Sequence, residues 1–85
     1  MRYPIAIEPG SEATAFGVIV PDLPGCFSAG DTFDEAVHNA AEAIATWLAA
    51  THAAGEPVPA ASTSTELRVR HPELAGWIWA EASTV

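Results

Sequence analysis

The stretch at residues 21–40, PDLPGCFSAGDTFDEAVHNA, carries the sequence signals of a tight turn, a short strand and the start of a helix. Pro-Gly at 24–25 suits a type II turn, because proline presets φ at the first central position and glycine accepts the positive φ of the second. Residues 26–29 are β-prone and predict a short strand. Thr32, followed three residues later by Glu35, is typical of a capping box at a helix N-terminus. The stretch therefore predicts a strand that leads directly into a helix.

The predicted helix spans residues 33–54. Its apolar residues recur at spacings of three and four, which places them on one face: Phe33, Val37, Ala40, Ile44, Trp47 and Leu48. Gly55 suits the position just after a helix, where the chain often turns left-handed. Pro57 and Pro59 keep the helix from resuming.

Three further strands are expected around this unit. Residues 2–8 alternate apolar side chains, and residues 14–20 form a second β-rich run, so the two predict an antiparallel hairpin. Residues 8–11, Glu-Pro-Gly-Ser, suit its type II turn. A short helical turn is expected from Thr65 to His71, and residues 76–82 predict a last strand. The sequence thus predicts an α+β fold, a three-stranded antiparallel meander plus a fourth C-terminal strand, with one main helix on one face.

The expected core material is limited, because many of the apolar residues are alanine. The large apolar residues expected to supply it are Tyr3, Ile5, Ile7, Phe16, Val18, Ile19, Val20, Leu23, Phe27, Phe33, Val37, Ile44, Trp47, Leu48, Leu67, Val69, Leu74, Trp77, Ile78 and Trp79. One helix covers only one face of a four-stranded sheet. We therefore expect the other face to be polar or to be covered by another chain in a homo-oligomer or a heterocomplex.

The charge balance restricts the partners. Eleven carboxylates face three arginines, for a formal net charge of −8. Such a charge repels nucleic acid phosphates and favours encounter with a basic protein.

Cys26 is the single cysteine, so no internal disulfide is expected. The sequence offers no secretory signal and no apolar run of about 20 residues, so we expect a cytoplasmic protein without membrane segments.

Catalytic chemistry has little support in the sequence. The three histidines are far apart and match no metal-ligand spacing, and Cys26 has no recognisable base beside it. Glu8, Glu42 and Glu81 loosely resemble the acidic set of a two-metal nuclease, which remains an alternative. We otherwise expect no catalytic residues, no metal and no cofactor.

The segment PDLPGCFSAGDT at residues 21–32, followed by Glu35-Ala36 and Asn39-Ala40, resembles the HicB family of antitoxins. This resemblance implies a degenerate ribonuclease-H-like fold, self-association as a dimer or tetramer, and binding to a small basic mRNA-cleaving toxin of the HicA type. Many family members also carry a C-terminal DNA-binding domain, which we do not expect within residues 1–85. Either this is a short member or that domain has been removed.

The expected partner-binding residues are acidic side chains near the loops and the helix start, with two tryptophans as possible anchors, because tryptophan is enriched at binding hot spots. They are Asp22, Asp31, Asp34, Glu35, Trp77 and Trp79. Trp77 and Trp79 are expected to share one face of the last strand, either as core or as an interface anchor. An alternative to the antitoxin role is an orphan module that only oligomerises or docks to another protein.

Overall fold

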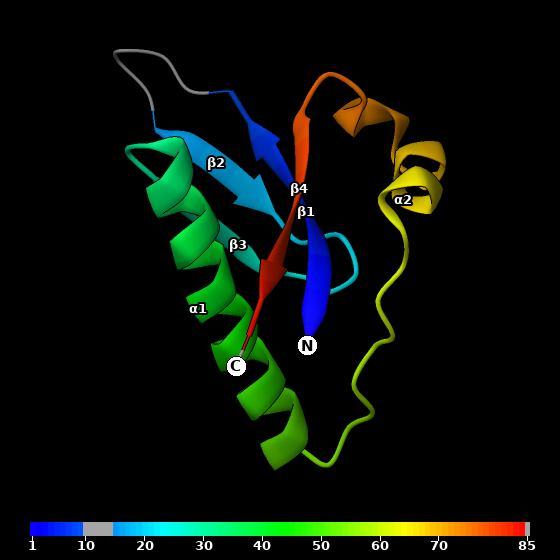
Figure 1. Ribbon diagram of the computed structural model, residues 1–85. Helices are drawn as coiled ribbons and strands as arrows, with labels where there is room; N and C mark the ends of the chain where they lie inside the picture. The colour runs from blue at the N-terminus through cyan, green and yellow to red at the C-terminus, as the bar shows by residue number, and fades with distance from the viewer. Residues whose placement is uncertain (10–14, 85) are drawn as a thin grey trace.

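The computed structural model describes residues 1–9 and 15–84 (Figure 1). The elements in chain order are β1 (Arg2–Glu8), β2 (Phe16–Ile19), β3 (Phe27–Gly30), α1 (Phe33–Ala53), α2 (Ser64–Arg70), the 3-10 helix η1 (Pro72–Leu74) and β4 (Ile78–Ser83). The predicted α+β fold class is confirmed. The predicted turn at residues 8–11 falls largely outside the described residues.

The four strands form one antiparallel sheet in the order β3-β2-β1-β4. The hairpin of β1 and β2 pairs Ile7 with Val18, and β4 returns along the other side of β1, pairing Ile7 with Ile78. Since side chains alternate between the two faces of a strand, directly opposed residues share a face. The register therefore places Ile5 and Ile7 on the face that α1 covers, and sends Ala6 to the opposite face.

The main core lies between this sheet and α1. Its fully buried side chains include Tyr3, Ile5, Ile7 and Val20 from the strand side and Ala36, Ala40 and Ile44 from the helix. The small residues of α1 permit a close approach to β3. A Cβ at Gly30 would collide with the backbone of Ala36. The side chain of Asn39 also donates a hydrogen bond to the Ala29 carbonyl at 2.8 Å, so α1 holds the outer edge of β3.

The turn between β2 and β3 has the predicted form. Gly25 has a φ of 79°, and the Cys26 N–H donates to the Leu23 carbonyl at 3.0 Å, which closes the turn around Pro24 and Gly25. The Trp47 indole N–H donates to the Pro24 carbonyl at 2.9 Å, so α1 fixes the turn as well.

Both ends of α1 follow from local chemistry. Thr32 Oγ1 accepts a hydrogen bond from the Glu35 N–H at 3.1 Å, which is the first of the two bonds of the predicted capping box. At the other end Gly55 has a φ of 71°, and its N–H donates to the His52 carbonyl. The Glu56 N–H donates to the Thr51 carbonyl, which completes a Schellman motif.

The full reciprocal capping box occurs at α2 instead. Thr63 Oγ1 accepts from the Glu66 N–H, and the Glu66 carboxylate accepts from the Thr63 N–H, each at 3.1 Å. The Thr63 N–H and the Thr63 hydroxyl both donate to the Glu66 carboxylate, and these two hydrogen bonds lower the pKa of Glu66 because they favour its ionised form. The helix begins one residue earlier than the predicted helical turn.

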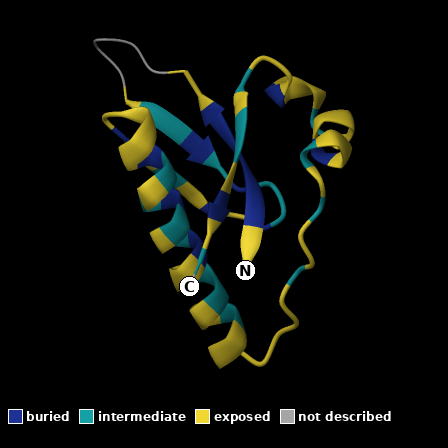
Figure 2. Ribbon diagram, viewed as in Figure 1, coloured by how far each residue is buried: buried dark blue, intermediate teal, exposed yellow. Residues whose placement is uncertain are grey.

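The face of the sheet opposite α1, hereafter the far face, carries a continuous row of side chains across all four strands. Phe27 on β3 is opposite Ile19 on β2, Ile19 is opposite Ala6 on β1, and Ala6 is opposite Trp79 on β4. Central strand β1 is buried along most of its length (Figure 2). The far face is thus neither polar throughout nor fully covered.

The core prediction was wrong at four large residues. Strand alternation turns Phe27 to the far face, and Phe33 and Val69 lie on exposed sides of their helices. Ile78 shares the α1-covered face with Ile7, yet at the start of β4 it stays partly exposed. The exposed fractions are 65% for Phe27, 37% for Phe33, 77% for Val69 and 39% for Ile78. In β3, Ser28 rather than Phe27 shares the core face with Val18, its direct partner.

Candidate partner-binding site

Three of the expected acidic residues lie together at the start of α1. Asp31 follows β3 directly, and Asp34 and Glu35 occupy the first helical turn; all three are exposed. Their position suits the positive end of the helix dipole, which is a structural reason for their presence. Because their carboxylates remain exposed, they are also available to a partner.

Asp22 has a different environment from these three. Its Oδ2 accepts a hydrogen bond from the Ser62 N–H, and its Oδ1 accepts one from the Ser62 hydroxyl, both at 2.8 Å. The Arg70 guanidinium in turn donates to the same hydroxyl. Asp22 therefore joins the β2–β3 turn to the segment that precedes α2.

Tyr3 lies close to this junction. Its hydroxyl donates to the Pro59 carbonyl at 2.7 Å, which holds the same segment at a second point. Burial raises the pKa of Tyr3, and the negative charge of Asp22 raises it further. Sequence reasoning placed Tyr3 only in the core and missed this contact, since partners 56 residues apart leave no local signal.

The two tryptophans do not share a strand face as expected. Strand β4 begins at Ile78, two residues later than predicted, because the Trp77 N–H donates to the Leu74 carbonyl in the turn after η1 instead of joining the sheet. Trp77 and Trp79 are both half-buried.

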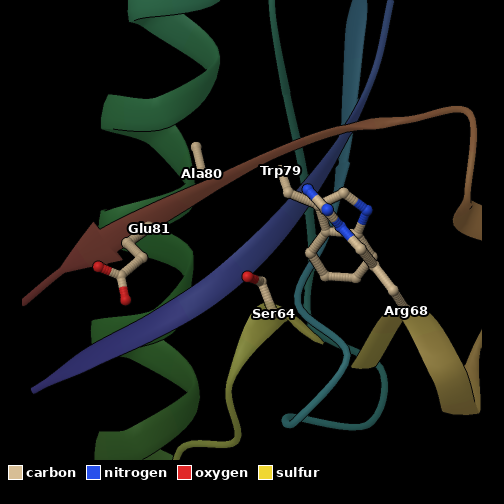
Figure 3. A pocket seen from close by; sticks show the side chains of 5 residues that line it. All are labelled: Ser64, Arg68, Trp79, Ala80 and Glu81. Carbon is tan, nitrogen blue, oxygen red and sulfur yellow. The ribbon is translucent and has the colours of Figure 1, made fainter. Parts of the chain in front are cut away.

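Trp79 lies on the far face beneath α2. The guanidinium carbon of Arg68 is 5.8 Å from the centre of its ring, and Ser64 and Glu81 help to line a shallow pocket of about 220 Å³ beside it (Figure 3). Figure 3 shows Trp79 on the α2 side of the sheet, while Ala80 points toward α1. The buried indole N–H of Trp79 has no hydrogen-bond partner within the described residues.

The other chemistry-bearing residues do not converge. Within residues 1–9 and 15–84 there is no group of three or more potential metal ligands, so Glu8, Glu42 and Glu81 are not gathered into one site. Glu42 lies 3.0 Å from His38, and Glu81 lies 3.5 Å from Arg2. Cys26 is buried, and burial raises the pKa of its thiol, which disfavours the nucleophilic thiolate.

In the part of the chain that the structure describes, no helix is long and apolar enough to cross a membrane.

These features define a small α+β domain with an acidic helix start and a far face that a short helix covers over only part of its width. Residues 3–84 match the model of the HicB-like antitoxins of bacterial toxin-antitoxin systems, and the chain belongs to this family.

Relatives and solved structures agree with this assignment. A 14.9 kDa protein from the rep-hol intergenic region of Haemophilus phage HP1 is 42% identical over 78 residues, covering 92% of this chain and 56% of that protein. The crystal structure of Burkholderia pseudomallei antitoxin HicB is 41% identical with a TM-score of 0.84, covering 99% of this chain and 63% of that one. A chain in the HicA3–HicB3 toxin-antitoxin complex is 33% identical with a TM-score of 0.77, covering 100% and 99%.

The chain therefore spans between half and two thirds of the phage relative and of the Burkholderia antitoxin.

Proposed function

We propose that this chain neutralises a small basic mRNA-cleaving ribonuclease of the HicA type by binding it, without catalysis of its own. The observation that carries this proposal is membership of the HicB-like antitoxin family, together with the likeness to a chain in a HicA3–HicB3 complex. The net charge of −8 supports a basic partner. Opposite charges accelerate the encounter of two proteins, whereas the negative charge of this chain repels nucleic acid phosphates.

Inhibition on this proposal is steric and electrostatic. The exposed carboxylates of Asp31, Asp34 and Glu35 would attract the cationic surface with which the toxin holds RNA. Asp22 would contribute through its charge, since both of its oxygens already accept hydrogen bonds from Ser62. Trp77 and Trp79 are proposed as lesser contributors, because neither is fully exposed.

The proposal includes self-association and action in the cytoplasm. Strand β4 lies at one edge of the sheet, so its outward N–H and C=O groups face away from β1. Such an edge can pair with a strand of another chain. A sedimentation experiment that finds only monomer at high concentration would remove self-association from the proposal.

The test of the antitoxin role begins with the genes that adjoin this one. A small basic reading frame found there is co-expressed with this chain, and the absence of such a frame would favour the orphan docking module. Rescue of growth together with co-purification of the two proteins is the expected result. If the reading frame is toxic alone and this chain neither rescues growth nor binds its product, then the antitoxin role fails for residues 1–85. The orphan docking module would then be the better description.

A further inference from the structure

Phe27 is exposed in a way that the fold does not require. It lies on edge strand β3 with 65% of its surface accessible, although burial of a phenylalanine side chain contributes about 1.5–3 kcal/mol. Its neighbour Ser28 faces the core side of the sheet instead. A side chain that forgoes this stabilisation in the free chain is a candidate anchor for a partner, because aromatic residues dominate the energetics of binding interfaces.

The residues that neighbour Phe27 on the far face are apolar or small. Ile19 is directly opposite Phe27, and the next pair on the same face is Gly17 with Ala29. We call these four residues the open half of the far face. Gly17 needs no unusual backbone angle, and among residues 1–9 and 15–84 a Cβ placed there would meet the Glu8 side chain alone, at 3.8 Å. The glycine therefore leaves this part of the surface without a protruding side chain. Packing of the core does not require a glycine at this position.

The charges bordering the open half have one sign. Glu8 pairs directly with Gly17 on the same face, and Asp31 follows the last residue of β3; both carboxylates are exposed. All three arginines of the chain lie elsewhere. Arg2 contacts Glu81 of β4, while Arg68 and Arg70 belong to α2. The open half is apolar and has acidic side chains at its border, so it matches a partner that presents an apolar group among basic side chains.

We propose that the open half of the far face is the surface that binds the basic toxin, with Phe27 as its anchor. This inference rests on the proposed function and names the surface that performs it. A second copy of the chain fits less well, because symmetric contact through this surface would bring two pairs of Glu8 and Asp31 carboxylates together.

The test measures binding of the purified product of the neighbouring basic reading frame to Phe27→Ala, Phe27→Asp and Gly17→Thr. Gly17→Thr adds a β-branched side chain that protrudes from the open half, and threonine is compatible with a strand. Val69→Asp is the matched control, because it makes the same apolar-to-acidic change at an exposed residue of α2. Circular dichroism and the denaturation midpoint establish that each variant is folded.

We expect Phe27→Ala to weaken binding by about 30-fold and Phe27→Asp by more, as for a hot-spot residue, while Val69→Asp changes it by less than about threefold.

If the wild type binds but folded Phe27→Asp and Gly17→Thr bind as well as Val69→Asp, then the surface is wrong and the antitoxin role stands. If the wild type does not bind, the proposed function and this inference both fail. Conversion of a dimer to a monomer by Phe27→Asp, with toxin affinity unchanged, would reassign the surface to self-association and overturn the inference.

Discussion

The two halves of the far face share one row of side chains but differ in what lies above them. On the β4 side, Ala6 is fully buried and Trp79 lies under Arg68 of α2. On the β3 side, Ile19 is only half-buried and Phe27 is mostly exposed. The covered half therefore stabilises the free chain, whereas the open half contributes little to stability and is available for binding. Four predictions test or refine this difference.

The largest effect is expected at Gly30, where β3 is held from the core side. Gly30→Ala would place a methyl group against the backbone of Ala36, so strand and helix would have to separate. We expect a loss of about 3 kcal/mol or more in the free energy of unfolding, measured by urea denaturation. Gly17→Ala is the control, since within the described residues its methyl group makes ordinary van der Waals contacts. Equal losses in the two variants would mean that α1 does not fix β3.

A smaller loss is expected at Trp79 in the covered half. Trp79→Ala should cost about 2–3 kcal/mol, somewhat below the value for a fully buried tryptophan, because the side chain is only half-buried. Phe27→Ala at the other end of the row should change the free energy of unfolding by less than about 0.5 kcal/mol. Denaturation of both variants under the same conditions gives the comparison directly. Similar losses would contradict the distinction between the two halves.

The segment that carries α2 over the covered half depends on Asp22. Asp22→Ala should lower the free energy of unfolding by about 1–2 kcal/mol, because the Ser62 N–H and hydroxyl lose their acceptor. The pKa of Tyr3 should fall at the same time, since the charge of Asp22 helps to raise it, yet burial keeps it above its ordinary value of 10.0. Tyr3 is the only tyrosine, so ultraviolet titration reports it without overlap. An unchanged Tyr3 titration would place Asp22 away from this junction in solution.

The smallest effect concerns the acid stability of α2. Hydrogen bonds with Thr63 lower the pKa of Glu66 below its ordinary value of 4.5, so its ionised form is favoured in the folded chain. The resulting stabilisation is present above the pKa of the unfolded chain and is lost as the pH falls through the lower pKa of the folded one. The protection factors of the α2 amides, which are their exchange rates corrected for the intrinsic effect of pH, should therefore fall in acid more in the wild type than in Glu66→Gln. Identical pH dependence in the two proteins would remove this contribution.

Much of the fold could be predicted because its signals are local. The Pro24-Gly25 turn, the Thr32 cap and the Gly55 terminus each depend on neighbours within a few residues, and the structure has all three. The covering of the far face could not be predicted in this way. It depends on contacts such as Arg68 over Trp79 and Ser62 on Asp22, which connect distant parts of the chain.

The candidate site shows the same division between local and distant information. Exposure of Asp31, Asp34 and Glu35 follows from the helix start and was accessible from the sequence. Exposure of Phe27 depends on the register of β3 and on how far α2 extends over the sheet. The alternation Cys26-Phe27-Ser28 holds a usable signal, since buried Cys26 and half-buried Ser28 flank the exposed phenylalanine. Without the register, however, the choice of buried face in a four-residue strand is ambiguous.

The central claim, that the open half binds the basic toxin, is tested most directly by hydroxyl-radical footprinting of the chain alone and in complex with the product of the neighbouring reading frame. We predict that oxidation of Phe27 falls strongly on complex formation, while oxidation of Val69, exposed on α2, stays unchanged. A complex in which Phe27 reacts as fast as in the free chain, with protection at Val69 or elsewhere, would contradict the claim.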